Sequence, residues 1–456
     1  MVGPANHQGA GPRTVYERLV HLMLQQRMPA GTLDIMWPGG GTTSYTGREA
    51  GPHAEVHLHD SAAAKAIARE GSMGLAEAYM DGQWDTPDLA AVLDLGGAGM
   101  KAGGMEGADG RPSLVHKFAH ALAANTRRGS KRNIAAHYDL GNDFYELWLD
   151  PSMTYSAACF EDDCVDLAEA QRRKYDRILE IADPDTRSHL LEIGCGWGGF
   201  ALHAAKTAGC RVTGVTLSRE QYDQARARVA AEGLEGKVDI VLTDYRDVPG
   251  VYDRIVSIEM VEAVGEKYWP VFFRRVRELL ARSGTAALQT ITIPEERFES
   301  YRDNPDFIQR YIFPGGMLPS PERFALAAHD AGLEVGEPRF FGHSYADTLQ
   351  AWLERFDTAV DDVKALGFDD RFVRMWRFYL AFCRSGFRYD TIDVMQVALR
   401  QAVRSTRHAS TLAAAQACPR THKRPSVAEE RRGVCRSVGG PEWIRTTDLT
   451  VISRAL

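Results

Sequence analysis

Residues 190–200 read Leu-Leu-Glu-Ile-Gly-Cys-Gly-Trp-Gly-Gly-Phe, a short apolar run that ends in a glycine-rich turn. Gly194, Gly196 and Gly199 satisfy the spacing G-x-G-x-x-G between an expected strand and an expected helix. Because glycine has no Cβ, such a turn bends tightly and lets the backbone approach a ligand. The spacing also fits a dinucleotide site, so on its own it does not decide which cofactor is bound.

The chain beyond this turn alternates strand-like and helix-like segments. Apolar runs indicate strands at residues 189–193, 211–217, 238–242, 254–258 and 285–293. Amphipathic periods indicate helices at residues 200–208, 219–232 and 268–280. Ser218 is expected to cap the second of these helices. The alternation predicts an α/β fold with a doubly wound, Rossmann-like parallel sheet that binds its ligand at the carboxyl ends of the strands.

Acidic residues near the glycine turn separate the two cofactor classes. A dinucleotide site requires a carboxylate about 20 residues further on, at the end of the second strand, but residues 214–218 read Gly-Val-Thr-Leu-Ser. Glu192 instead precedes the first glycine, and Asp244 ends the third strand. This pattern resembles the class I S-adenosylmethionine methyltransferases. S-adenosylmethionine is therefore the expected cofactor, and no metal is expected.

More specific motifs lie on both sides of the glycine turn. They are His-Tyr-Asp-Leu-Gly-Asn-Asp-Phe-Tyr at 137–145, Asp-Pro-Ser-Met-Thr-Tyr-Ser at 150–156, Gly-Val-Thr-Leu-Ser at 214–218, Asp-Tyr-Arg-Asp at 244–247 and Tyr-Ile-Phe-Pro-Gly-Gly at 311–316. Together they resemble the cyclopropane-fatty-acyl-phospholipid synthase family over about residues 28–402. The resemblance implies transfer of the methyl(ene) group of S-adenosylmethionine to the cis double bond of an unsaturated phospholipid acyl chain, which forms a cyclopropane.

The same resemblance implies a cofactor pocket and a catalytic site. It assigns to the pocket Tyr155, Ser156, Gly194, Gly196, Thr216, Leu217, Gln221 and Arg246. Three acidic residues are added as expected cofactor contacts: Glu192, Asp244 and Glu259. The catalytic site, where the family holds a bicarbonate ion as the base, receives Glu262, Tyr345, Gln289 and Ile291.

The expected base site departs from the family pattern. Ala157 stands where better-known members have Cys, and Gln289 and Ala263 stand where they have His. Glutamine can donate a hydrogen bond to an anion but cannot titrate, so bicarbonate binding is an open question. Methyl transfer leaves a carbocation on the acyl chain, and a base that removes a proton from the new methyl group closes the ring. Loss of a different proton gives a methylene- or methyl-branched chain, which is the alternative product.

Two other functions stay open. Some relatives methylate amines, which suggests a small-molecule N-methyltransferase, although the N-terminal domain and the Phe-Pro-Gly-Gly segment at 313–316 favour a lipid. The lost Cys and His suggest a non-enzymatic protein that binds S-adenosylmethionine or lipid. The retained Glu262 and Tyr345 argue against it.

Composition and charge divide the 456 residues into four parts. Residues 1–95 predict a smaller α+β domain of the family's lipid-binding and dimerisation type, and 126–403 the methyltransferase domain. Between them, the glycine-rich residues 96–125 predict a flexible linker. Residues 404–456 hold ten Lys/Arg and four Asp/Glu, so the remaining chain carries −13 within a formal total of −7. We expect this basic segment to be a disordered or non-native tail.

Charge and cysteine use limit the partners and the compartment. A net charge of −7 gives no case for nucleic acid. Seven scattered cysteines without a C-x-x-C pair indicate reduced thiols in a cytoplasm. No run approaches the roughly 18 apolar residues that span a bilayer. Expected partners are an unsaturated phospholipid, a peripheral membrane surface and, by resemblance, a second copy of the chain. Residues 371–380 predict a helix on the core, with a helix that lines the acyl channel as the alternative.

Overall fold

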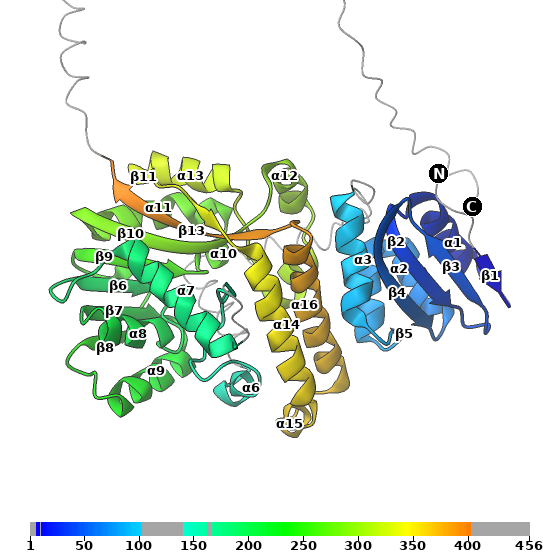
Figure 1. Ribbon diagram of the computed structural model, residues 1–456, viewed down its shortest axis with the longest axis horizontal. Helices are drawn as coiled ribbons and strands as arrows, with labels where there is room; N and C mark the ends of the chain where they lie inside the picture. Colours follow the sequence, from blue (N-terminus) through cyan, green and yellow to red (C-terminus); the bar gives the residue numbers. More distant parts are fainter. Residues whose placement is uncertain (1–5, 10, 103–139, 162–165, 403–456) are drawn as a thin grey trace, which may run out of the picture. The chain divides into compact units, whose positions relative to one another are not determined.

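The computed structural model describes residues 6–9, 11–102, 140–161 and 166–402 (Figure 1). The larger sheet has the strand order β11-β13-β10-β9-β6-β7-β8, with β12 paired to β13. Its strands are β6 His189–Ile193, β7 Arg211–Thr216, β8 Val238–Leu242, β9 Tyr252–Ile258, β10 Leu280–Thr292, β11 Leu333–Val335, β12 Arg339–Phe340 and β13 Asp393–Gln401. The neighbouring strands β10, β9, β6, β7 and β8 are parallel to one another. Strand β13 is antiparallel to β10, β11 and β12. The predicted doubly wound α/β sheet is confirmed.

Helices follow the strands as the sequence predicted. α9, Arg219–Ala231, begins after Ser218, whose side chain accepts a hydrogen bond from the Gln221 N–H. The other helices of this part are α6 Asn142–Glu146, α7 Leu167–Ala182, α8 Gly199–Thr207, α10 Val261–Val264, α11 Trp269–Leu279, α12 Glu295–Asp303, α13 Pro321–Asp330, α14 Gly342–Thr358, α15 Val360–Ala365 and α16 Asp370–Arg388. Short helical turns occur at η1 Tyr245–Asp247, η2 Glu266–Tyr268 and η3 Ile308–Ile312.

The strand order reverses between β6 and β9. From β6 the chain continues to β7 and β8 on one side, and it then returns to place β9 on the other side of β6. Loops at such a reversal separate beyond the carboxyl ends of the strands, where open α/β sheets bind their ligands. The loop after β6 carries Gly194 and Gly196, and the loop after β9 carries Glu259. The topology therefore brings together two segments that the sequence analysis singled out.

A second, smaller sheet lies in the N-terminal part, in the order β1-β3-β2-β4-β5. Its strands are β1 Asn6–Gln8, β2 Ala30–Met36, β3 Thr42–Thr46, β4 Glu49–Leu58 and β5 Trp84–Asp85. The helices here are α1 Val15–Arg27, α2 Ser61–Met80 and α3 Leu89–Lys101. This matches the α+β composition expected for residues 1–95. Among the described residues, none of the helices has the length and apolar character that a bilayer crossing requires.

The prediction of a flexible linker from residue 96 is wrong at its start, because α3 continues to Lys101. One glycine of α3 serves helix packing: a Cβ on Gly97 would lie 2.5 Å from the Ser385 Oγ of α16. Small residues at this position let the two helices approach each other closely. The rest of the linker, residues 103–125, and the tail 404–456 lie outside the described residues, as do residues 137–139 of the His-Tyr-Asp motif.

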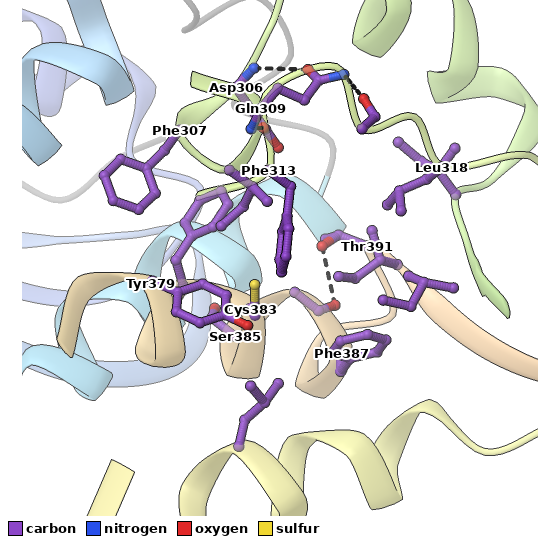
Figure 2. A pocket seen from close by; sticks show the side chains of 18 of the residues that line it. Asp306, Phe307, Gln309, Phe313, Leu318, Tyr379, Cys383, Ser385, Phe387 and Thr391 are labelled. Carbon is purple, nitrogen blue, oxygen red and sulfur yellow. Dashed lines mark hydrogen bonds between the residues drawn. The ribbon is translucent and has the colours of Figure 1, made fainter. Parts of the chain in front are cut away.

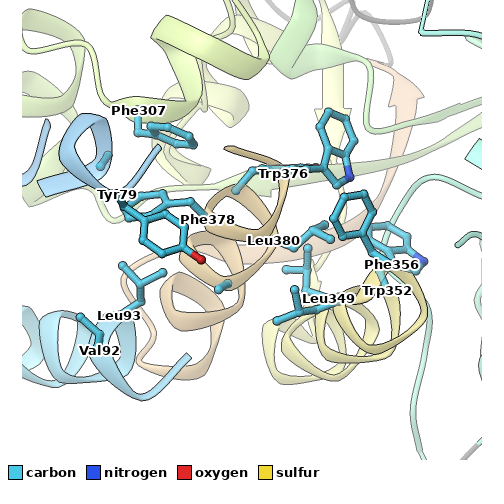
Figure 3. Close-up of a cluster of buried hydrophobic side chains, with 14 of the residues drawn as sticks. Tyr79, Val92, Leu93, Phe307, Leu349, Trp352, Phe356, Trp376, Phe378 and Leu380 are labelled. Carbon is cyan, nitrogen blue, oxygen red and sulfur yellow. The ribbon is translucent and has the colours of Figure 1, made fainter. Parts of the chain in front are cut away.

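Figure 3 shows buried side chains of α2, α3, α14 and α16 in one hydrophobic cluster. Phe378 of α16 lies with its ring centroid 4.8 Å from that of Phe307 and 5.9 Å from that of Tyr79 in α2. Trp376, also in α16, is 1% exposed and packs edge-on against Phe144. The basic and aromatic segment 371–380 is thus a core helix, as predicted. Tyr379 of the same helix also lines a cavity.

Candidate active site

A cavity of about 1150 Å³ begins at the glycine turn and includes the expected base site. This volume exceeds the range of about 300–1,000 Å³ that is typical of small-ligand pockets. The predicted cofactor residues that line it are Tyr155, Ser156, Glu192, Gly194, Gly196, Thr216, Leu217, Gln221 and Glu259. The predicted catalytic residues that line it are Glu262, Ile291 and Tyr345. Gln289 is fully buried and reaches the site through its hydrogen bonds.

Backbone conformation explains the glycines of the turn. Gly194 has φ +84° and Gly196 has φ +52°, in the left-handed region where a Cβ is unfavourable. A Cβ on Gly194 would lie 2.3 Å from the Cγ of Met260, so this glycine permits the turn to pack against the loop after β9. At Gly196 no atom of the described residues lies within 4 Å of the Cβ position. Gly196 therefore borders open space that a ligand can occupy.

Two buried ionisable side chains lie at or beside this space. Glu192 is 3% exposed, and its Oε2 has no hydrogen-bond partner among the described residues. Burial raises the pKa of Glu192 to about 8. Lys174 of α7 is fully buried, donates a hydrogen bond of 2.7 Å to the Ser156 Oγ, and has its pKa lowered by burial to about 8. The sequence analysis missed Lys174, although a lysine within the apolar stripe of Leu167, Ala170 and Ile178 was a usable signal.

The Asp244–Arg246 pair is arranged differently from the prediction. Asp244 accepts hydrogen bonds from the Arg246 Nε, at 2.8 Å, and from the Arg246 Nη2, and it caps the turn η1. Neither side chain lines the cavity, whereas their neighbours Thr243 and Tyr245 do. The carboxylate of Asp244 is thus engaged within the protein, and its expected direct contact with the cofactor stays a prediction.

The expected base site centres on Glu259, directly after β9. Its Oε1 accepts hydrogen bonds of 2.8 Å from the Ala157 N–H and 2.8 Å from the Gln289 Nε2. Its Oε2 accepts a hydrogen bond of 2.7 Å from the Tyr345 hydroxyl. Burial raises the pKa of Glu259, and the three donors act in the opposite direction. Two of the four predicted catalytic residues, Tyr345 and Gln289, therefore hold this carboxylate.

Glu262 occupies a separate position one turn further along the chain. Its Oε1 accepts hydrogen bonds from the Ile291 N–H and from the Thr290 Oγ1, the latter at 2.9 Å. Its Oε2 is buried without a partner among the described residues. Burial, followed by the nearby charge of Glu259, raises the pKa of Glu262 to about 8. The predicted catalytic residue Ile291 thus donates its backbone N–H to Glu262, whereas Tyr345 and Gln289 donate to Glu259.

An aromatic channel continues from these carboxylates. Figure 2 shows Phe313, Tyr379, Cys383 and Phe387 around this part of the cavity. The Tyr379 hydroxyl lies 2.7 Å from the Tyr155 hydroxyl, which connects the channel to the predicted cofactor pocket. The site therefore combines a polar, charged end at the glycine turn with an apolar end lined by aromatic rings.

Comparison with known proteins decides the family. Residues 125–397 match the model of the mycolic acid cyclopropane synthetase family, which is more than half of the chain. The chain belongs to this family. It is an S-adenosylmethionine-dependent methyltransferase, and S-adenosylmethionine is its cofactor. The glycine turn, the unpartnered Glu192 oxygen and the open space beside Gly196 suit a ligand that carries sulfonium and ammonium charges.

Two relatives extend the match beyond the family model. The methyltransferase is 40% identical over 371 residues to "Tuberculostearic acid methyltransferase UfaA1" of Mycobacterium tuberculosis, covering 78% of this chain and 85% of that protein. It is 36% identical over 366 residues to "Cyclopropane-fatty-acyl-phospholipid synthase" of Escherichia coli K12, covering 77% and 88%. The crystal structure of mycolic acid cyclopropane synthase CmaA1, complexed with SAH and CTAB, has a TM-score of 0.56 and 32% identity, covering 59% of this chain and 98% of that one.

The buried Glu192 predicts a proton-linked cofactor affinity. Its folded-state pKa of about 8 lies above the ordinary 4.5, so between these values the folded protein holds a proton that the unfolded chain has lost. This contribution to the free energy of unfolding therefore falls as pH rises from about 5 to about 8. Because the cationic cofactor favours the carboxylate, S-adenosylmethionine should displace that proton at pH ~7. Calorimetry in two buffers of different ionisation enthalpy should show proton release that Glu192→Gln reduces; equal release by both proteins would contradict this role.

Proposed function

We propose that this methyltransferase transfers the methyl group of S-adenosylmethionine to a cis double bond in the acyl chain of an unsaturated phospholipid. The observation that carries the proposal is the continuity of the cavity, which joins the cofactor loop to the aromatic channel and to apolar residues of the N-terminal domain such as Val20, Leu33 and Val56. A long apolar chain suits such a cavity. A small polar amine does not require it, so the N-methyltransferase alternative ranks lower.

The double bond of the acyl chain is a weak nucleophile, and the residues that line the cavity position it and shield it from water. The cofactor, when bound, supplies an electrophilic methyl group. The walls of the channel hold the double bond close to it and in line, which replaces an improbable encounter by a positioned one. They also exclude water, which would trap the carbocation that methyl transfer leaves on the acyl chain. The faces of Phe313, Tyr379 and Phe387 can stabilise that positive charge.

The product depends on what happens to the carbocation. Removal of a proton from the new methyl group closes a cyclopropane without rearrangement, and this is the first product that we propose. A hydride shift before the same deprotonation gives a methylene-branched chain. The departures at Ala157, Gln289 and Ala263 favour this second candidate, as does the likeness to a protein named tuberculostearic acid methyltransferase.

Vesicles of dioleoyl phosphatidylglycerol test the function directly. We expect S-adenosylhomocysteine release with these vesicles and none with vesicles of the saturated dipalmitoyl lipid, because only the former offer a double bond. Mass spectrometry of the acyl chains should show the added mass of one CH₂ group. Ozonolysis then distinguishes the isomers, since it cleaves an exocyclic alkene and leaves a cyclopropane intact. Turnover of soluble amines without turnover of vesicles would overturn the proposal.

We also propose that α1 brings the protein to the membrane surface. One face of this helix exposes apolar side chains, with exposed fractions of 66% for Val15, 43% for Leu19, 47% for Leu22 and 37% for Met23. Exposed Arg18 and Arg27 accompany them, as suits an interfacial helix on anionic lipid. Met23 and Arg27 also line the cavity, so the apolar face borders the space that we assign to the lipid.

The double substitution Leu19→Asp and Leu22→Asp should weaken sedimentation with anionic vesicles about 10-fold or more, because it removes apolar area and adds negative charge. Val251→Asp with Leu326→Asp is the matched control, since these apolar residues are also exposed, at 62% and 61%, but lie outside α1. The control should bind vesicles like the wild type. A change in oligomeric state caused by the α1 variant, with vesicle binding intact, would show instead that this face joins two copies of the chain.

A further inference from the structure

The hydrogen-bond donors expected to hold bicarbonate are already engaged in this protein. The Tyr345 hydroxyl and the Gln289 side-chain amide both donate to Glu259, and the N–H of Ala157 donates to the same carboxylate. Ala157 stands at the position where better-known members have Cys. A side chain of the protein therefore occupies the place that the family gives to a bound anion.

Bicarbonate does not fit beside this carboxylate. A second anion would lie within the same buried group, next to the Glu259 carboxylate, and two neighbouring like charges strongly oppose each other in a site of low dielectric. Lys174, whose positive charge acts on Glu259, donates its hydrogen bond to Ser156. No donor of the expected set remains for an additional ion, since Ile291 N–H donates to Glu262.

We propose that Glu259 is the catalytic base of this methyltransferase and that its carboxylate replaces bicarbonate, so that the reaction needs no added anion. The inference rests on the proposed function, because it assigns the proton-removing step of that reaction. It also gives a physical reason for the departures from the family pattern: a glutamate in this place needs the hydrogen bonds of Gln289 and of a backbone N–H, and it does not need a titrating histidine.

Backbone geometry holds the carboxylate in place. Glu259 has φ +51°, a left-handed conformation that costs a residue with a Cβ about 1–2 kcal/mol and that persists where surrounding contacts require it. This turn directs the side chain across the ends of β9 and β10 to Tyr345 of α14. Oε1 accepts two hydrogen bonds, whereas Oε2 accepts only that of Tyr345 among the described residues and keeps a lone pair for a proton.

Burial raises the pKa of Glu259, and the neighbouring cation and hydrogen-bond donors oppose that rise. The groups that face it are Lys174 from α7, Glu262 from α10 and the hydroxyl of Tyr345 from α14. Lys174 supplies positive charge, and three donated hydrogen bonds stabilise the carboxylate. Glu262 has a pKa raised to about 8 by burial and by the charge of Glu259, so at neutral pH it is the member of the pair that holds the proton.

The proton balance of the step is simple. A C–H bond of the transferred methyl group breaks, and its electron pair forms the new carbon–carbon bond to the cationic carbon. The proton goes to the Oε2 of Glu259. It leaves to water when the product has left the cavity, which regenerates the carboxylate without any further reactant.

Assays of the full chain in carbonate-free buffer, with and without added sodium bicarbonate, test the inference on dioleoyl phosphatidylglycerol vesicles. The wild type should turn over equally in both buffers. Glu259→Gln keeps the shape and removes the base, so its rate should fall about 100-fold or more. Glu259→Gly relieves the left-handed backbone and frees three donors. Its low rate should rise several-fold on addition of bicarbonate, an effect that a merely structural role of Glu259 does not produce.

A single cooperative thermal transition and retained S-adenosylhomocysteine binding serve as folding controls for both variants. Glu262→Gln is the matched substitution of the neighbouring buried carboxyl and should lose less activity than Glu259→Gln. A wild type that requires bicarbonate, or a Glu259→Gln variant that keeps its rate, overturns the inference alone. A wild type that is inactive on oleoyl vesicles in both buffers overturns the proposed function, and the inference with it.

Discussion

Replacing Gly196 by alanine is expected to lower the affinity for S-adenosylhomocysteine about 10- to 100-fold without a matching loss of stability. No atom of the described residues lies within 4 Å of the Cβ position, and Gly196 lines the cavity. A methyl group added there meets no protein atom in that range, so a loss of affinity reports contact with the ligand itself. Overpacking of this kind costs about 1–3 kcal/mol. Titration calorimetry measures the affinity, and urea unfolding measures the stability.

Gly233→Ala provides the matched control. Gly233 also has a positive φ, +64°, also has no described atom within 4 Å of its Cβ position, and does not line the cavity. Both substitutions therefore place a Cβ on a left-handed backbone, which destabilises the protein by about 1–2 kcal/mol. Only Gly196→Ala adds an atom to the space for the ligand. If Gly196→Ala bound the ligand as tightly as Gly233→Ala does, the cofactor would not lie over this part of the turn.

The sheet and the glycine turn were predictable because their signals are local. An apolar run followed by glycines fixes a strand and a tight turn, and the alternation of such runs with amphipathic helices fixes a doubly wound sheet. Ser218 caps α9 as its residue type suggests. The reversal of strand order between β6 and β9 then explains why residues from two distant loops line one cavity.

The different hydrogen-bond partners of Glu259 and Glu262 were not predictable from their spacing in the sequence. Three residues apart, the two carboxylates would share one face of a regular helix. The left-handed conformation of Glu259, with φ +51°, places it before the helix α10 and turns its side chain toward Tyr345. Sequence alone does not report a positive φ at a glutamate. The full length of α3 was not predictable for a related reason, since close helix packing, as at Gly97, and flexibility favour the same residue type.

Contacts between the N-terminal helices and α16 could not be predicted from the sequence either. Arg384 of α16 donates hydrogen bonds of 3.0 Å and 3.0 Å to the two carboxylate oxygens of Asp94 in α3, across 290 residues of chain. Ser385 donates a further hydrogen bond of 2.8 Å to the carbonyl oxygen of Leu93. No local sequence pattern links residues so far apart, and none of their residue types by itself indicates a long-range contact.

Asp94→Leu is expected to lower the free energy of unfolding by about 3–5 kcal/mol, the largest stability effect that we predict. The side chains of Asp94 and Arg384 are only 9% and 10% exposed, so the substitution leaves a buried guanidinium without its main counter-charge. The nearby Arg388, 3.8 Å from the Asp94 carboxylate, loses the same partner. Urea unfolding followed by fluorescence should show the earlier midpoint.

Two further variants distinguish the effect of an unpaired buried charge from general damage to the contact between α3 and α16. Lys101→Met breaks an ion pair of 2.6 Å with Asp390, which joins the same two parts of the chain, but these side chains are 58% and 51% exposed. Water screens such a pair, so its loss should cost at most about 1 kcal/mol. The double variant Asp94→Leu with Arg384→Met removes both buried charges and should recover most of the lost stability, because apolar side chains replace a buried pair at little cost. If Asp94→Leu cost no more than Lys101→Met, or if the double variant were less stable than Asp94→Leu, burial of the unpaired charge would not be what holds α3 against α16.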